Sequence, residues 1–233
     1  MIAVIVPAHD EAHAIGRCLA SITAAAADPR LRGEAVITVV ALDACTDDTA
    51  AVCAAHGATT LEVAARCVGT ARAAAAEHAL ARGARWIAST DADTEVPADW
   101  LWRQLRCGAD AFCGVVEVVD WLDYPDVVRT AFSGREAMRD GHRHVHGANL
   151  GLSAAAYRAV GGFPPLRTGE DVALVEALAG SGARIAWLAR PVVATSARRS
   201  ARAPHGFSSF LRALEREVLG SGVALRPAQL VPE

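Results

Sequence analysis

Residues 86–93 read Trp-Ile-Ala-Ser-Thr-Asp-Ala-Asp, an apolar run that ends in two carboxylates one residue apart. Side chains at positions i and i+2 of an extended segment point to the same side, so Asp91 and Asp93 converge on one point. Two carboxylates at a strand end suit Mg²⁺ or Mn²⁺ carrying a diphosphate, because these cations prefer oxygen ligands. A solvated turn after a strand would use the same residues. The surrounding sequence has to separate these two interpretations.

Strand and helix patterns alternate around this stretch. Short apolar or β-branched runs predict strands at residues 2–6, 35–42, 59–63 and 85–89. Helical spacing and Ala-rich composition predict helices between them at residues 12–26, 47–56 and 68–82. Such alternation is typical of a mostly parallel sheet flanked by helices. Ligands of these sheets bind beyond the carboxyl ends of the strands, where His9, Asp43 and Asp91 all fall.

The second half of the chain is less regular. The pattern predicts helices at residues 97–106, 153–160, 172–179 and 207–219, with strands at 109–119 and 184–188. In the helix at 172–179, Val172 and Val175 are expected to face inward. A polar, partly helical insertion fills residues 120–142. We find no linker, low-complexity tract or repeat, which indicates one α/β domain.

Composition excludes several classes of protein. The 233 residues carry a formal net charge of −3, which offers no electrostatic footprint for nucleic acid. No lysine occurs, so Schiff-base and P-loop lysine chemistry is excluded. No apolar stretch reaches the roughly 20 residues of a transmembrane segment, although a peripheral membrane contact stays open. The six cysteines form no Cys-x-x-Cys pair, and we expect reduced thiols in a cytoplasmic protein.

Five segments occur in an order that characterises one family. They are 5–11 (Ile-Val-Pro-Ala-His-Asp-Glu), 41–49 (Ala-Leu-Asp-Ala-Cys-Thr-Asp-Asp-Thr), 68–72 (Val-Gly-Thr-Ala-Arg), 91–93 (Asp-Ala-Asp) and 168–171 (Thr-Gly-Glu-Asp). In these segments the chain resembles the family 2 glycosyltransferases with the GT-A fold, over roughly its first 190 residues. The resemblance implies a Rossmann-like, mostly parallel sheet flanked by helices in a single domain, residues 1–233. Residues 1–95 would bind the nucleotide-sugar, and residues 96–233 would bind the acceptor and end in a C-terminal helix.

The resemblance assigns the donor side to the first two segments. It places Pro7, His9 and Glu11 against the nucleotide, with His9 where the family usually has Asn. Asp43 matches the second acid of the family's D-D-G-S-x-D motif, while Leu42 replaces the first. Asp43 would then accept a hydrogen bond from a uracil N–H. This favours a UDP-sugar donor and leaves a GDP-sugar open.

Asp91 and Asp93 match the D-x-D motif of the family. The resemblance implies that Asp93 holds Mn²⁺ or Mg²⁺ and that Asp91 contacts the metal or the ribose. The cation would stabilise the charge that grows on the leaving nucleoside diphosphate. His205 would be a third metal ligand. Arg72 matches a family arginine near the donor, with a solvated helix face as the alternative.

Glu170 and Asp171 form the second carboxylate pair. Capping of a helix by acids in its first turn would explain both. In the resembled family, the second acid is the general base of inverting transferases, so Asp171 would take the proton of the acceptor hydroxyl. Glu170 would help to orient the acceptor. A basic loop that contains Arg198, Arg199 and Arg202 either closes over the pyrophosphate or is simply solvated.

The acceptor itself is not identified beyond a hydroxyl group. Residues 144–149 resemble the family's acceptor segment, and we discount its two histidines, His144 and His146, as metal ligands. The insertion at 120–142 would shape the acceptor pocket, where Trp121 and Tyr124 either stack on a sugar or lipid or lie in the core.

Two other functions remain as alternatives to hexose transfer. The departures at His9 and Leu42 allow an inactive module that binds nucleotide-sugars. A nucleotidyltransferase would need a Gly-rich basic loop after the first strand, which residues 7–11 do not provide.

Overall fold

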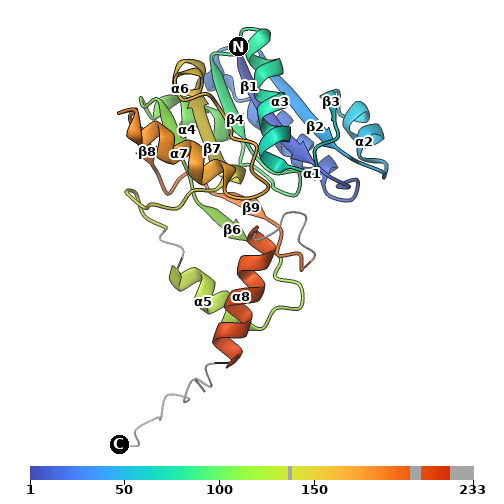
Figure 1. Cartoon of the computed structure of the whole chain (residues 1–233), viewed down its shortest axis with the longest axis vertical. Coiled ribbons are helices and arrows are strands. Elements are labelled where there is room, and N and C mark those ends of the chain that lie inside the picture. The colour runs from blue at the N-terminus through green and yellow to red at the C-terminus, as the bar shows by residue number, and fades with distance from the viewer. Residues whose placement is uncertain (136–137, 200–205, 221–233) are drawn as a thin grey trace, which may run out of the picture.

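The computed structural model describes residues 1–135, 138–199 and 206–220 (Figure 1). Within these residues a seven-stranded sheet has the order β3-β2-β1-β4-β7-β5-β8, and a two-stranded sheet pairs β6 with β9. The strands are β1 (Ile2–Ala8), β2 (Val36–Asp43), β3 (Thr59–Val63), β4 (Trp86–Ser89), β5 (Ala111–Cys113), β6 (Val116–Val118), β7 (Leu150–Ser153), β8 (Ile185–Trp187) and β9 (Val193–Thr195). The predicted mostly parallel α/β sheet is confirmed.

Helices separate most of these strands. They are α1 (Ile15–Ala26), η1 (Pro29–Leu31), α2 (Thr49–Ala55), α3 (Val68–Ala81), α4 (Trp100–Arg106), α5 (Asp126–Arg135), η2 (Gly147–Asn149), α6 (Ala154–Ala159), α7 (Glu170–Gly180) and α8 (Phe207–Gly220). The chain leaves α2 and α3 through Gly57 and Gly83, whose positive φ angles of 68° and 83° suit glycine. Ser153 caps α6, as its side chain accepts a hydrogen bond from the N–H of Ala156.

The parallel strands bring their carboxyl ends to one edge of the sheet. β1 runs parallel to β2 and to β4, and the register sets Ala8 beside Leu42 and Ile5 beside Ser89. The segments that follow these strands therefore meet at one edge. On the other side of β4, β7 runs antiparallel to both β4 and β5.

Apolar side chains fill both faces of the sheet. Along β1, Ile2, Val4 and Val6 belong to one core cluster, while Ala3 and Ile5 belong to the other, as expected for alternating side chains. α1 and α4 contribute buried residues to the first cluster, and α3, α6 and α7 contribute to the second. The packed helices therefore support the sheet from both faces, up to the edge where the parallel strands end.

α5 and α8 pack side by side and project away from the main sheet (Figure 1). The aromatic rings of Phe132, Phe207 and Phe210 join them, together with Trp121 from the preceding loop. The short β6–β9 sheet lies between this helix pair and the main sheet (Figure 1).

Two other expectations concern membrane-spanning helices and cysteine pairing. Among the residues described above, no helix combines the length and apolar character that a membrane crossing requires. All six cysteines lie in described segments, and each is a free thiol.

Some predicted elements are wrong. The single strand expected at 109–119 is two strands in two different sheets, because the chain changes sheet at Gly114. A Cβ at Gly114 would lie 2.3 Å from Nδ2 of Asn149, so a larger residue does not fit this crossing. Val172 does not face inward, since it is 41% exposed, whereas Val175 is buried as expected and Leu174 is buried as well. Strands β7 and β9 were not predicted.

Candidate active site

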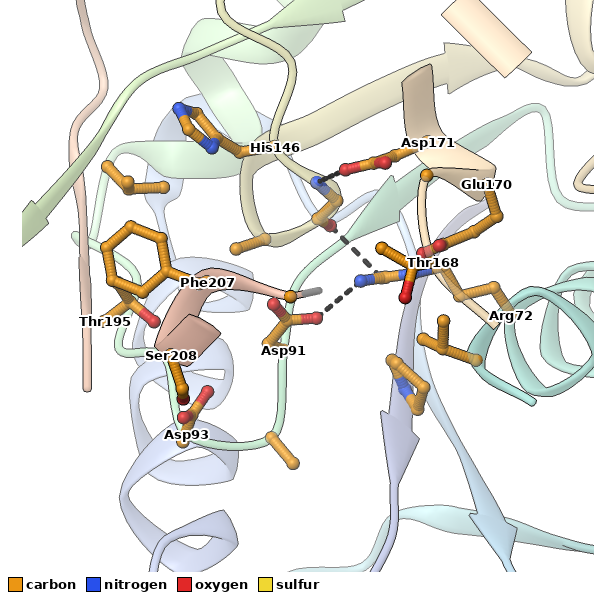
Figure 2. Close-up of a pocket in the computed structure, with 18 of the residues that line it drawn as sticks. Arg72, Asp91, Asp93, His146, Thr168, Glu170, Asp171, Thr195, Phe207 and Ser208 are labelled. Atoms are coloured by element: carbon orange, nitrogen blue, oxygen red, sulfur yellow. Dashed lines mark hydrogen bonds and ion pairs between the residues drawn. The ribbon is translucent and has the colours of Figure 1, made fainter. Parts of the chain in front are cut away.

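One cavity of about 760 Å³ opens at the carboxyl edge of the parallel strands. Its lining comes from the segments after β1, β2 and β4, from the starts of α3, α7 and α8, and from residues 144–148. Nine of the ten residues predicted to bind the donor, to bind the metal or to catalyse transfer lie in this lining: Pro7, His9, Glu11, Asp43, Arg72, Asp91, Asp93, Glu170 and Asp171. The structure thus brings both carboxylate pairs to a single space (Figure 2).

Arg72 connects the two carboxylate pairs. Its side chain is 3% exposed, and its guanidinium donates from Nη2 to Asp91 at 2.5 Å and from Nε to Glu170 at 2.9 Å. Further hydrogen bonds reach the hydroxyl of Ser89 and, at 3.1 Å, the carbonyl of Gly147. Burial opposes the charge of this guanidinium, yet the facing carboxylates raise the pKa of Arg72 overall. Arg72 is therefore a fixed internal cation and not a solvated surface residue.

Gly147 links this cation to Asp171. The carbonyl of Gly147 accepts hydrogen bonds from Arg72 and from Ser89 at 2.8 Å, while its N–H donates to Oδ2 of Asp171 at 2.7 Å. Its place allows no side chain, since a Cβ would lie 2.5 Å from Nη2 of Arg72. The peptide group of Gly147, held at both its carbonyl and its N–H, therefore helps to orient Asp171.

Glu170 and Asp171 have different environments although they are adjacent. Glu170 is buried against Arg72, and burial raises the pKa of its carboxyl even though Arg72 acts in the opposite direction. Asp171 is only half-buried and accepts hydrogen bonds from two backbone N–H groups, those of Gly147 and Val172. Asp171 is the member of the pair that faces the cavity with acceptor capacity left, since two oxygens offer about four lone-pair sites.

Negative charge gathers around Asp93. Burial, together with the charges of Asp91 and Glu11, raises the pKa of Asp93 to about 6 in spite of the nearby Arg198. Nε of Arg198 lies 3.4 Å from Oδ2 of Asp93, and its Nη1 pairs with Glu11. The side chain of Ser208, at the start of α8, points toward Asp93 (Figure 2). A region this rich in carboxylates favours a bound cation.

The expected divalent metal fits this donor set. Asp91 and Asp93 present carboxylate oxygens to the cavity, and Mg²⁺ is typically held by one or two carboxylates plus substrate phosphates. Within the described part of the chain, no cluster of three or more His, Cys, Asp or Glu side chains is arranged to hold a metal by itself. The phosphate groups of a substrate could supply further oxygen ligands.

Asp43 organises the loop between β3 and α3. Its Oδ1 accepts from the N–H groups of Ala65 at 2.9 Å and Arg66 at 2.7 Å, and its Oδ2 accepts from Cys67 at 2.7 Å. His9 donates from Nδ1 to the carbonyl of Asp43 at 2.7 Å, which ties the end of β1 to the end of β2. The expected contact of Asp43 with a base stays a prediction. Three backbone donors still leave the carboxylate one acceptor position.

The segment that was expected to line the acceptor side contains a ladder of imidazole rings. His142 stacks on His144 with centroids 5.7 Å apart, and His144 stacks on His146 at 6.0 Å. His144 and His146 line the cavity. Stacked rings expose edges and faces to a substrate, and no described metal cluster includes them.

The insertion at 120–142 contributes to the cavity through Phe132 and Arg135. Trp121 and Tyr124, for which stacking on an acceptor and a core position were both left open, are not among the lining residues. Tyr124 is buried beneath the guanidinium of Arg199, whose carbon lies 4.1 Å from the ring centre. Of the two interpretations left open by the sequence, the core position is the one observed.

The remaining expectations concern the basic loop. His205 and Arg202 lie outside the described residues. Arg198 lines the cavity, whereas Arg199 pairs with Asp123 and Glu215.

Sequence reasoning missed Ser89, Phe207 and Phe210, and it overlooked Gly147 within the quoted acceptor segment. Gly147 could have been noticed, because a glycine that directly follows two alternating histidines at a predicted strand edge indicates a close backbone approach.

Comparison with known proteins identifies the family. The sequence pattern described as glycosyl transferase family 2 matches residues 3–158, which is more than half of the chain. No curated protein shows a significant match.

Solved structures show where the fold recurs. The S. aureus TarS fragment 1–349 in complex with UDP-GlcNAc matches with a TM-score of 0.66 and 16% identity, covering 92% of this chain and 65% of that chain. This chain therefore spans slightly less than two thirds of that fragment. The mannosyltransferase PcManGT from Pyrobaculum calidifontis, in complex with GDP-Man and Mn²⁺, matches with a TM-score of 0.62 and 21% identity. The match covers 97% of this chain and 76% of PcManGT. A mycobacterial protein matches with a TM-score of 0.59 and 18% identity, and the match covers 95% of this chain and 73% of that protein.

Identities this low show the fold alone, while the family rests on the sequence match over residues 3–158. The chain belongs to glycosyl transferase family 2, and its fold is the GT-A fold of these structures.

Proposed function

We propose that this protein transfers a hexose from a nucleotide diphospho-sugar to an acceptor hydroxyl, with inversion and with Mn²⁺ or Mg²⁺ as cofactor. The observation that carries this proposal is a single cavity lined by Asp91 and Asp93 at one place and by Glu170 and Asp171 at another. The first pair follows β4 beside the donor-side residues, and the second begins α7. A donor and an acceptor bound between them would bring the reacting atoms together.

Asp171 would act as the general base. Two backbone N–H groups fix its carboxylate, and the free acceptor positions would take the proton of the acceptor hydroxyl. As that proton leaves, the hydroxyl oxygen forms a bond to the anomeric carbon. The bond from this carbon to the phosphate oxygen breaks, and its electron pair departs with the nucleoside diphosphate. Glu170 is better suited to holding Arg72, with which it pairs at 2.9 Å.

A divalent cation, when bound, would neutralise charge on the departing diphosphate. Asp91 and Asp93 would hold it, with Arg72 fixing the orientation of Asp91 through their 2.5 Å contact. Arg198 lies close enough to Asp93 to contact the same phosphates, since guanidinium groups bind phosphate oxygens in pairs. The Mn²⁺ in the PcManGT complex supports this choice of cofactor.

A UDP-sugar is the preferred donor. Asp43 retains an acceptor position for a uracil N–H, and the TarS complex contains UDP-GlcNAc. A GDP-sugar stays open as the alternative donor, because the PcManGT complex contains GDP-Man. A cytoplasmic location stays our prediction, based on the six free thiols.

The test is nucleotide-sugar turnover with water as acceptor. UDP-glucose, UDP-GlcNAc and GDP-mannose are incubated with the protein and Mn²⁺, and release of the nucleoside diphosphate is measured. Asp171→Asn should lower turnover by about 10²–10⁴-fold while the nucleotide still binds, because Asn can accept from Gly147 but cannot take a proton. Glu176→Gln, at an exposed acid on the same helix, is the matched control.

An inactive binding module is the second candidate. The ion pair of Arg198 with Asp93 favours it, because this pair satisfies the carboxylate without a metal. Nucleotide binding without turnover of any of the three donors would support the module and reject the transferase.

A further inference from the structure

The cavity has an apolar lobe that the proposed chemistry does not use. Val116 from β6, Phe132 from α5 and Phe207 and Phe210 from α8 line it. Phe207 lies on the side of the cavity opposite Glu170 and Arg72 (Figure 2). The lobe therefore begins at the reacting centre and runs toward the α5–α8 helix pair.

The three phenyl rings form a fixed wall. Phe132 is 4% exposed, and the rings of Phe207 and Phe210 pack against it with centroid distances of 5.9 Å and 6.4 Å in edge-to-face geometry. Phe210 is nevertheless 40% exposed within the cavity lining. A rigid apolar wall that stays accessible needs no rearrangement before an apolar ligand binds to it.

Among the described residues, the charged member of the lining that comes from α5 or α8 is already paired. Arg135 is the charged residue of the lining that shares α5 with Phe132, and it pairs with Glu217 on α8. The carboxylates of the site lie on the segments that follow the sheet strands and at the start of α7. An uncharged group would fit this wall better than an anionic one.

The position of the lobe identifies its occupant. A donor would fill the side of the cavity near His9, Asp43 and Arg72, as the proposed function requires. A molecule that presents its hydroxyl to Asp171 must then extend away from the donor, over His146 and Phe207 (Figure 2). The same cavity continues from there to Phe210. The occupant of the lobe is therefore the part of the acceptor next to its reactive hydroxyl.

We propose that the acceptor carries an uncharged apolar chain or ring beside the hydroxyl, and that Phe207 and Phe210 bind this group. We infer this on the basis of the proposed transfer reaction. Phe207 and Phe210 would then determine acceptor specificity, in the place that the sequence suggested for Trp121 and Tyr124. A plain, fully polar sugar would leave the wall uncovered and would bind weakly.

The test compares three glycosides that share one sugar. Octyl, phenyl and methyl β-D-glucopyranoside, each below its micellar concentration, are titrated calorimetrically into the full chain, with and without UDP and Mn²⁺. We expect the octyl or phenyl compound to bind at least about tenfold more tightly than the methyl compound. A preference for octyl would indicate a chain such as that of a lipid, and a preference for phenyl would indicate an aryl group; either supports the proposal. Equal binding of all three would overturn it.

Two exposed apolar residues of α8 provide matched variants. Phe210 lines the cavity, whereas Leu219 is 56% exposed on the same helix and does not. Phe210→Ser should abolish most of the preference, Leu219→Ser should keep it, and Phe210→Leu should restore part of it. Equal effects of Phe210→Ser and Leu219→Ser would reject the assignment to this wall.

The two proposals can fail separately. Binding of UDP and Mn²⁺ is measured in its own titration, and turnover is measured with the donors alone. Absence of both, with the glycoside preference intact and dependent on Phe210, would reject the transferase and retain the apolar site. Donor turnover with no glycoside preference would retain the transferase and reject the apolar acceptor.

Discussion

The guanidinium of Arg198 lies 3.4 Å from the carboxylate of Asp93, measured between Nε and Oδ2. The acid expected to hold a divalent cation therefore already faces a positive charge of the protein itself. The same guanidinium contacts Glu11, so it bridges two acids of the cavity. Two cations at one carboxylate repel each other, and Arg198 and a metal ion should compete for Asp93.

Removal of this arginine should strengthen metal binding in the absence of nucleotide. Arg198→Ala is expected to bind Mn²⁺ about fivefold to tenfold more tightly than the wild type, since a nearby like charge is worth roughly 1 kcal/mol in a partly solvated site. Calorimetric titration with Mn²⁺ measures the change. Arg199→Ala, which breaks ion pairs with Asp123 and Glu215, should leave the affinity unchanged. Identical Mn²⁺ affinities in the wild type and Arg198→Ala would contradict the competition.

Arg72 should be essential for stability as well as for the site. Arg72→Ala leaves Glu170 buried without its cation and frees Asp91, and breaking a buried ion pair from one side costs about 3–5 kcal/mol. Urea unfolding measures the loss. Arg82→Ala, at the exposed end of the same helix, should change the free energy of unfolding by less than about 0.5 kcal/mol. A similarly small loss for Arg72→Ala would show that the buried pairs are not formed in solution.

Gly147→Ala should damage the link between Arg72 and Asp171. The added methyl would lie 2.5 Å from Nη2 of Arg72, so the guanidinium or the peptide must move. We expect a stability loss of about 1–3 kcal/mol, as for overpacked interiors, and a fall in turnover. Gly134→Ala is the control, because nothing lies within 4 Å of its added Cβ in α5. That change should stabilise the protein by about 0.5–1 kcal/mol. Unimpaired turnover in Gly147→Ala would show that the position of Asp171 does not depend on the Gly147 peptide.

A surface ion pair gives a pH-dependent prediction. The hydrogen bond from Arg85 is the main reason why the pKa of Glu34 lies below its ordinary value of 4.5. The pair therefore stabilises the protein above pH 4.5, and the contribution is lost as the pH falls through the lowered pKa. Glu34→Gln should cost about 0.5–1 kcal/mol at pH 7, and this difference should shrink as the pH falls through the lowered pKa, because protonated Glu34 is neutral like Gln.

Thermal unfolding of both proteins across this pH range measures the effect. Arg85→Ala should remove only part of this increment, because the N-terminal ammonium also pairs with Glu34 at 3.1 Å, and the double variant should lose little more than Glu34→Gln alone. A constant difference at all pH values would contradict the assignment.

The first half of the fold could be predicted because its signals are local. β3 occupies the expected residues, and the ends of α2 and α3 are marked by Gly57 and Gly83. The acids after β2 and β4 follow from the rule that ligands bind at the carboxyl ends of parallel strands. Each of these predictions needed only neighbouring residues.

The second half depends on contacts between remote residues. Asn149 is fully buried, and its side chain donates to the carbonyls of Val115 and Pro191 and accepts from Trp100. This network fixes the point at which the chain changes sheet, but no periodicity reveals it. The ion pair between Arg198 and Asp93 joins equally distant segments, so it could not be seen in the sequence.

β7 enters the sheet between β4 and β5, antiparallel to both. On a ribosome β4 would emerge long before this partner, so the nascent sheet would keep an open edge of unpaired N–H and C=O groups. A chain truncated after β4 would retain that edge and tend to aggregate. Residues 1–95 should therefore need the second half of the chain to become a stable protein.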